Sequence, residues 1–266
     1  MPLAVCATPI GNLDDITLRV LAALREADVV LAEDTRHTRV LLDRHGIRAT
    51  LLSYHEHNEA ARVAELLPRL EAGERLALVS DAGMPAVSDP GARLVRAALD
   101  AGVEVTVLPG PSAVETALVA SGLAGGRYAF VGFLPRKAAE LDAFWRESAG
   151  WGFPLVAFES PRRLAASLRS LAAVDPEREV AVCRELTKRF EEVARGAVRE
   201  LSERFREPPK GEITLVVGAG SAIFDPDEAR AAVAELIAAG TPRRVAADVV
   251  ARLTDMSRND LYRGSL

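Results

Sequence analysis

The sequence is poor in cysteine, histidine and aromatic residues. Its 266 residues include two cysteines, four histidines and two tryptophans, and aromatic side chains make up 5% of the total. Cys6 and Cys183 both lie in short apolar runs, which favours buried, reduced side chains over a disulfide. The His55–His57 segment has no cysteine nearby and only two glutamates as further ligands. No metal site is therefore predicted.

The sequence also lacks long apolar runs and strongly basic segments. No run of about 18 apolar residues is present, which excludes a transmembrane helix. The first residues, MPLAVCATPIGN, carry no basic side chain and lead directly into a strand-like run, so no signal peptide is expected. The net charge is −5, and residues 1–127 carry 12 basic and 17 acidic side chains. We expect a cytoplasmic protein that does not bind nucleic acid through its overall charge.

What is present is a regular alternation of apolar runs and segments with helical spacing. This pattern over the first ~120 residues predicts an α/β fold with a mostly parallel sheet covered by helices on both faces. Asp14 or Asp15 is the candidate cap of the first helix, which is expected to end near Ala27. The predicted strands of this half are residues 3–8, 29–32, 51–53, 76–80 and 103–108.

The second half repeats the alternation with different proportions. The glycine-containing stretch Gly122–Arg127 is the candidate joint, so we predict domains at residues 1–121 and 122–220. Residues 221–266 read as a small helical tail of helix-turn-helix type, which either packs as an appendage or binds nucleic acid. The predicted strands here are residues 128–132, 154–159, 179–183 and 213–217, with helices at residues 138–149, 164–173, 198–205, 227–239, 243–253 and 257–262.

Two loops in the centre of the chain form the candidate ligand site. The run Leu76–Ser80 ends in a loop rich in glycine and proline, and Val103–Leu108 ends in Pro-Gly-Pro-Ser. Open α/β sheets bind ligands at the carboxyl ends of their strands, where such loops meet. No strand leads into G-x-G-x-x-G, which disfavours a nicotinamide dehydrogenase.

Several motifs together resemble one family. They are ATPIGN (7–12), AEDTRHT (32–38), SDAGMPAVSDPG (80–91), PGPSA (109–113), VGFLPRK (131–137), FESPRR (158–163), RELTK (184–188), EEVARG (191–196) and KGEITLVV (210–217). In this order they are similar to the ribosomal RNA small-subunit methyltransferase I family of the tetrapyrrole methylase superfamily. The resemblance covers nearly the whole chain and is least specific in the tail.

The resemblance implies two α/β domains with S-adenosylmethionine (SAM) in the cleft between them, and a homodimer. It also implies methyl transfer to the ribose 2′-hydroxyl of a cytidine in the decoding region of 16S rRNA, with the small ribosomal subunit as the expected partner. The residues that it assigns to the cofactor are Pro9, Gly11, Asp81, Ala82, Gly83, Pro85, Ser88, Asp89, Pro109, Gly110, Pro111, Ser112, Glu159, Ser160, Leu186, Lys210 and Gly211.

A ribose hydroxyl is a poor nucleophile, so help in removing its proton is expected. Candidate catalytic residues are Asp34 and Glu159 as bases and Lys188 as a stabiliser of the developing alkoxide. Glu33 is a further candidate base, and spacing alone does not choose among them. Paired cations in loops are candidate RNA contacts. They are Arg136, Lys137, Arg162, Arg163 and Arg189, and Arg36 is a further candidate that either pairs with Asp34 or binds a phosphate.

Two alternatives stay open at this point. The first keeps the cofactor and changes the acceptor to a tetrapyrrole or another small molecule. Arginine pairs in several loops argue against it. The second is a non-catalytic ribosome-assembly factor that binds RNA through its tail, which the ligand-type loops disfavour. SAM binding would separate the enzymes from the assembly factor.

Overall fold

The computed structural model describes residues 2–220, 226–254 and 256–264. Within these ranges no helix is both long and apolar enough to span a membrane. The strands are β1 (Leu3–Cys6), β2 (Val29–Ala32), β3 (Leu51–Ser53), β4 (Leu76–Val79), β5 (Val105–Leu108), β6 (Ala129–Phe133), β7 (Leu155–Glu159), β8 (Glu179–Arg184), β9 (Glu192–Ala197) and β10 (Ile213–Val217). The helices are α1 (Leu18–Glu26), α2 (Thr35–Arg44), α3 (Glu59–Glu71), α4 (Ala92–Asp100), α5 (Ala113–Ser121), α6 (Ala138–Ser148), α7 (Pro161–Val174), α8 (Val198–Arg204), α9 (Pro226–Ala238), α10 (Arg243–Thr254) and α11 (Arg258–Gly264).

The chain divides into two compact units. The first contains Met1–Gly122 together with two later segments, Val182–Val193 and Gly211–Thr214. The second contains Leu123–Ala181, Ala194–Lys210 and Leu215–Leu266. The three-part division into residues 1–121, 122–220 and 221–266 stays a prediction. The return of two later segments to the first unit matters for the site, because they carry several of the predicted residues.

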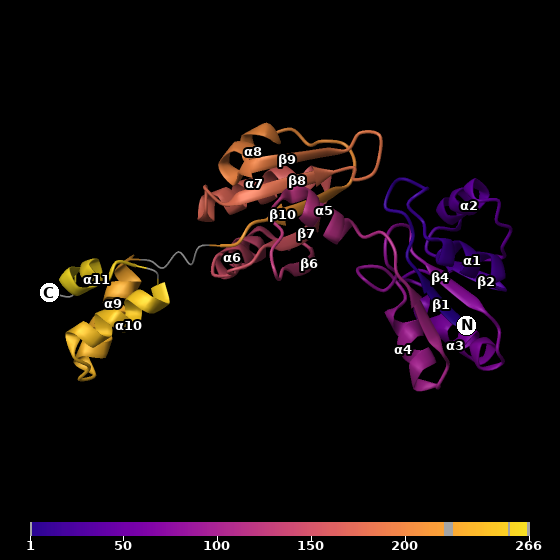
Figure 1. Ribbon diagram of the computed structural model, residues 1–266, viewed down its shortest axis with the longest axis horizontal. Helices are drawn as coiled ribbons and strands as arrows, with labels where there is room; N and C mark the ends of the chain where they lie inside the picture. Colours follow the sequence, from indigo (N-terminus) through magenta and orange to yellow (C-terminus); the bar gives the residue numbers. More distant parts are fainter. Residues whose placement is uncertain (1, 221–225, 255, 265–266) are drawn as a thin grey trace. The chain divides into compact units, whose positions relative to one another are not determined.

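The first sheet has the strand order β3-β2-β4-β1-β5, and each of its four neighbouring pairs is parallel. The register places Cys6 beside Val79 on one side and beside Leu108 on the other. All five strands therefore end at the same edge (Figure 1). The alternating pattern of the first half predicted this parallel, helix-covered sheet, and the structure confirms it.

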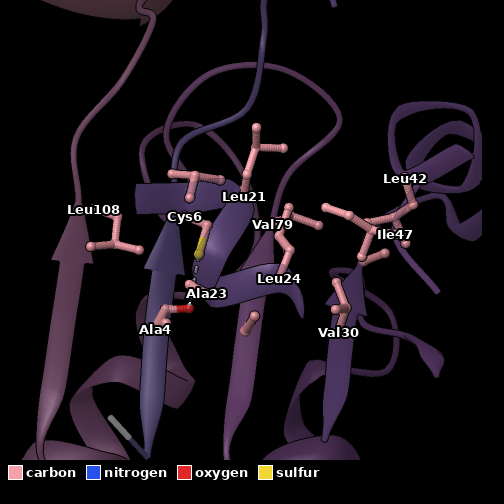
Figure 2. Close-up of a cluster of buried hydrophobic side chains, with 13 residues drawn as sticks. Ala4, Cys6, Leu21, Ala23, Leu24, Val30, Leu42, Ile47, Val79 and Leu108 are labelled. Carbon is pink, nitrogen blue, oxygen red and sulfur yellow. Dashed lines mark hydrogen bonds between the residues drawn. The ribbon is translucent and has the colours of Figure 1, made fainter. Parts of the chain in front are cut away.

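The two faces of this sheet bury side chains of different size. On the face covered by α1 and α2, the central strands contribute mainly small residues, such as Ala4, Cys6 and Ala77 (Figure 2). On the face covered by α3 and α4, the same strands contribute Leu3, Leu76 and other larger residues. Side chains of a strand point alternately to the two faces, so small and large residues alternate along the central strands.

The second sheet has the order β6-β7-β10-β8-β9, and β6 pairs with β7 in parallel. The strand β9 is missing from the sequence-based prediction. Its sequence EVARGA contains charged residues, and Ala194 is its only residue with less than a tenth of its surface exposed. It lies at the end of the strand order, where one side is unpaired, so it does not show the apolar run of a central strand.

The helices α9, α10 and α11 share a hydrophobic cluster of their own. Its buried members include Val233 of α9, Val250 of α10 and Leu261 of α11. The three predicted tail helices are therefore present, with bounds that differ by up to two residues. The structure does not test whether this tail binds nucleic acid.

Outside the tail, helices α1 and α7 begin at residues other than those predicted. Helix α1 begins at Leu18 and is capped by Thr17, whose side chain accepts a hydrogen bond from the Val20 N–H. The predicted cap at Asp14 or Asp15 is wrong, because Asp14 forms an ion pair with Arg44 of α2 instead. Helix α7 begins at Pro161, three residues before its predicted start, since proline is well accommodated at the first position of a helix.

Candidate functional site

The carboxyl ends of β1, β4 and β5 are joined by backbone hydrogen bonds. Thr8, which follows β1, exchanges two bonds with Gly83 in the loop after β4, at 2.8 and 3.0 Å between N and O. The Thr8 hydroxyl also donates to the Ser80 carbonyl oxygen at 3.0 Å. An added Cβ at Gly110, after β5, would lie 2.9 Å from the Ala7 Cβ. The first, fourth and fifth strands thus present their loops at one place.

The loop after β4 contains unusual backbone conformations. Ala86 and Ser88 have positive φ angles of 68° and 65°. Among the residues that the structure describes, the other non-glycine residues with positive φ are Glu185 and Thr187, in the segment after β8. Such angles cost free energy and concentrate at ligand-binding and catalytic sites. All four lie in the two loops that the motifs SDAGMPAVSDPG and RELTK single out.

The end of this loop is fixed from the neighbouring helix α3. Glu59 of α3 accepts hydrogen bonds from the Gly91 N–H and from the Tyr54 hydroxyl, both at 3.0 Å. Gly91 has φ 137°, and an added Cβ would lie 2.7 Å from Leu78 of β4. The loop from Asp81 to Gly91 is therefore held at both ends, while Ala82 and Ser88 remain exposed and Pro85 is buried.

Three carboxylates gather where β2 and β4 end. Asp81 accepts a hydrogen bond from the Asp34 N–H at 3.0 Å, which links the loops after the two strands. Burial, followed by the charge of Glu33, raises the pKa of Asp89 to about 6. Burial, with the charge of Asp81, also raises the pKa of Glu33. These shifts show that negative charges crowd one another in a half-buried site.

Asp34 already has a structural role. It is the N-cap of α2, and its carboxylate accepts from the Arg36 N–H at 2.8 Å. The Arg36 guanidinium adds bonds at 3.1 and 2.7 Å. These bonds hold the pKa of Asp34 well below its ordinary value. Asp34 is therefore a weak proton acceptor, and Arg36 is occupied by it, as one sequence-based interpretation expected.

The segment after β8 lies against the loop after β1 within the first unit. The Asn12 N–H donates to the Thr187 hydroxyl at 3.0 Å. A Cβ at Gly11 would lie 2.9 Å from the Leu186 carbonyl oxygen, so only glycine fits there. The structure thus brings together the predicted cofactor residues Gly11 and Leu186. Pro9, which lies just before Gly11 in the chain, is buried.

Lys188, in the same segment, is held by two carboxylates. Its ammonium group lies 3.1 Å from Glu185 and 2.7 Å from Glu212. Burial alone would lower the pKa of Lys188, but the hydrogen bonds to Glu212 and Glu185 more than offset it and raise the pKa. The side chain stays protonated, as a stabiliser of negative charge must. Gly211 packs directly against the Glu185 side chain.

In the second unit, Glu159 is buried at the end of β7. It accepts hydrogen bonds from the Ser160 N–H at 2.7 Å and from the Ser167 hydroxyl at 2.6 Å. Arg163 lies 3.4 Å from it and also donates to the carbonyl oxygens of Leu134 and Pro135. Glu159 and Arg163 therefore join the start of α7 to the loop after β6.

The remaining predicted cations differ in how they are engaged. Lys137 forms an ion pair with Glu140 in the first turn of α6. Arg136, Arg162 and Arg189 are exposed and form no ion pair with a described residue. Lys210 is also exposed. Three of the six predicted RNA contacts are thus free to bind a phosphate.

The sequence analysis did not assign Thr8, Ser80 or Glu59, whose side chains form hydrogen bonds with the backbone of the loop after β4. Thr8 and Ser80 lie inside motifs that were recognised, so their position could have been found. Glu59 carries no such signal, because its role depends on α3 lying beside Gly91. Among the described residues, no group of three or more His, Cys, Asp or Glu side chains is arranged so that it could hold a metal ion.

The chain resembles known methyltransferases in sequence. The model of the family "Tetrapyrrole (Corrin/Porphyrin) Methylases" matches residues 2–202. The chain is 46% identical over 264 residues to ribosomal RNA small subunit methyltransferase I of Mesorhizobium japonicum, covering 98% of this chain and 90% of that protein. It is 46% identical over 196 residues to the Thermotoga maritima protein of the same name, covering 73% and 86%.

Solved structures share the fold at lower identity. The cobalt precorrin-4 methyltransferase CbiF has a TM-score of 0.61 and 20% identity, covering 81% of this chain and 94% of that chain. Uroporphyrin-III C-methyltransferase from Thermus thermophilus, complexed with S-adenyl homocysteine, has a TM-score of 0.56 and 22% identity, covering 81% and 96%. At these identities the comparison concerns the fold alone.

Proposed function

We propose, since this chain belongs to the ribosomal RNA small subunit methyltransferase I family of the tetrapyrrole methylases, that it is a SAM-dependent rRNA methyltransferase. Its acceptor is the ribose 2′-hydroxyl of a cytidine in the decoding region of 16S rRNA. The observation that carries this proposal is the 46% identity to a relative of that name over 98% of the chain. The loops that the family motifs mark are also the ones with the strained backbone.

The residues of the first unit fit SAM in their chemistry. SAM carries a positive sulfonium and an amino group, and the crowded carboxylates Glu33, Asp81 and Asp89 would favour both charges. Backbone groups of the loops from Asp81 to Asp89 and from Pro109 to Ser112 would bind the polar parts of the molecule. When bound, SAM supplies an activated methyl group.

The protein must then place the acceptor oxygen and take its proton. We keep Asp34, Glu159 and Lys188 as proposed catalytic residues, but their surroundings rank them differently. Asp34 accepts hydrogen bonds from Arg36, which hold its pKa well below its ordinary value and make it a weak base. Both carboxylate oxygens of Glu159 already accept hydrogen bonds, from Ser160 and Ser167. Lys188 is held protonated and is suited to stabilise an alkoxide. Glu33, with its raised pKa, is the better candidate base of the first unit.

Arg136, Arg162 and Arg189 are the cations best placed to contact RNA phosphates, because they are exposed and form no ion pair with a described residue. We further propose that the substrate is 16S rRNA within the small ribosomal subunit, in the cytoplasm. We also propose a homodimer, which the edge strand β5 supports. Val107 on this strand is 54% exposed, and an apolar sheet edge favours association.

The test is methyl transfer from labelled SAM to unmodified small ribosomal subunits, followed by digestion to nucleosides and mass spectrometry. Label in 2′-O-methylated cytidine is the expected result. If SAM binds and no nucleoside is labelled, the acceptor is a different molecule, and the small-molecule methylase becomes the leading alternative. If SAM does not bind, the assembly-factor alternative replaces the proposal.

A further inference from the structure

The segment that joins β8 to β9 (Figure 1) contains an aromatic side chain that is exposed to solvent. Phe190 is 65% exposed, although the chain has few aromatic residues and most are at least partly buried. The Arg189 guanidinium carbon lies 5.5 Å from the centre of the Phe190 ring, within the range of a cation–π contact. A single exposed apolar side chain is common on protein surfaces, so Phe190 points to a ligand only together with the arginine and the hollow beside it.

The segment that carries Phe190 is well ordered by its own hydrogen bonds. The Thr187 N–H donates to Glu191 at 2.6 Å, and the Glu191 N–H donates to the Lys188 carbonyl oxygen at 3.1 Å. The Thr187 hydroxyl is in turn bound by the Asn12 N–H. Residues on both sides of Phe190 are therefore fixed, and the ring does not have to be ordered from a flexible loop when a ligand binds.

A hollow of about 500 Å³ adjoins this segment. It is lined by Gly11–Asp14 and Arg44 on one side and by Thr187, Lys188 and Arg189 on the other. Arg44 is neutralised by Asp14, and Lys188 by two glutamates. Arg189 is the lining cation without a carboxylate partner among the described residues. An anionic ligand in this hollow would therefore meet Arg189 next to the Phe190 ring.

We propose that Phe190 stacks on an unpaired nucleobase of the substrate RNA while Arg189 binds a neighbouring phosphate. Proteins commonly recognise single-stranded RNA by combining an aromatic face with an arginine, because every base offers a stacking surface beside a charged backbone. This inference rests on the proposed function and adds a substrate contact to it. Phe190 binds RNA and takes no part in holding SAM.

The experiment compares three substitutions at one position. Phe190→Ala removes the stacking surface, Phe190→Leu keeps an apolar side chain without a ring, and Phe190→Trp keeps and enlarges the ring. We expect Phe190→Ala and Phe190→Leu to raise the KM for small ribosomal subunits by about tenfold to a hundredfold. Phe190→Trp should stay within about threefold of the natural protein. Leu99→Ala, at another exposed apolar residue of the first unit, is the matched control and should change nothing.

Two further measurements separate the outcomes. SAM affinity by calorimetry should be the same in all variants, and a loss in Phe190→Ala would place the ring at the cofactor and overturn the inference. A change of molecular mass in analytical ultracentrifugation would assign Phe190 to an interface between copies and also overturn it. If Phe190→Leu keeps full activity, stacking is refuted. If the unsubstituted protein transfers no methyl group to cytidine, the proposed function is refuted, whatever the Phe190 variants do.

Discussion

Replacing Gly91 with alanine is expected to destabilise the first unit. Gly91 is the N-cap of α4, directly after the loop that holds Asp89, and its φ of 137° is a conformation that residues with a Cβ rarely adopt. The added Cβ would also lie 2.7 Å from the Leu78 Cδ2, in the buried cluster between β4 and α4. The substitution thus meets two separate penalties, one in the backbone and one in packing.

The size of the effect follows from these two penalties. The unfavourable backbone angle costs about 1–3 kcal/mol, and overpacking of a buried cluster costs about 1–3 kcal/mol more. Alanine also restricts the conformations of the unfolded chain, which offsets roughly 0.4–1 kcal/mol of this loss. The net loss is about 1–6 kcal/mol, which corresponds to a fall in the unfolding temperature of roughly 2–22 °C for a chain of this size.

Gly102→Ala is a closely matched control, because Gly102 follows the other end of the same helix. Its φ is 72° and no atom lies within 4 Å of an added Cβ, so only the backbone penalty applies. We expect a loss of about 0–1.6 kcal/mol, because the left-handed conformation costs about 1–2 kcal/mol and the restricted unfolded chain offsets roughly 0.4–1 kcal/mol of it. Thermal unfolding followed by circular dichroism measures both variants. If Gly91→Ala unfolds within about 2 °C of Gly102→Ala, the packing argument at Leu78 is wrong.

Three further predictions concern charged residues. Asp89→Asn should stabilise the protein at pH 7 and weaken SAM binding. The pKa of the Asp89 carboxyl rises from 3.8 to about 6 on folding, so the folded state binds more protons than the unfolded state between these values. The destabilisation caused by Asp89 therefore grows as the pH rises from about 4 to 6, and asparagine removes it. Urea unfolding at pH 7 and pH 4 checks this, and a stability gain that persists at pH 4 would contradict it. Glu159→Ala should cost about 3 kcal/mol, because it leaves the Ser160 N–H and Ser167 hydroxyl without their acceptor and frees Arg163; Glu159→Gln should lose less in the same unfolding assay. Arg162→Ala should leave SAM affinity and stability unchanged and reduce the salt dependence of RNA binding by about one unit of slope, whereas Arg163→Ala should also lower the unfolding temperature, since Arg163 binds two backbone carbonyls. Equal unfolding temperatures of these two variants would refute that distinction.

Much of the fold could be predicted because apolar runs and helical spacing reflect burial directly. The bounds of β2, β3 and β10 agree with the sequence-based prediction residue for residue. β2 and β10 are short runs in which every residue is buried, which is the pattern of a central strand. The strand β9 was not predicted, because an edge strand with one buried residue gives no such signal.

The site was predictable in outline and not in detail. The motifs located the loops after β1, β4 and β5, and the structure places Thr8 and Gly83 in direct contact there. No rule of sequence indicates that Ala86 and Thr187 adopt positive φ, because glycine is the residue expected at such angles. The sequence left two possibilities for Arg36, an ion pair with Asp34 or a phosphate contact, because the choice depends on where the Arg36 side chain turns.

The unequal faces of the first sheet have a consequence for how the chain finds its correct strand pairing. A shift of β1 by one residue would turn Leu3 and Val5 toward the helices α1 and α2, where Ala4 and Cys6 now fit. It would also leave small side chains against α3 and α4. One face would then be overfilled while the other was left with cavities. The size difference therefore disfavours a shifted pairing of β1 during folding, because one face would be overpacked and the other underpacked.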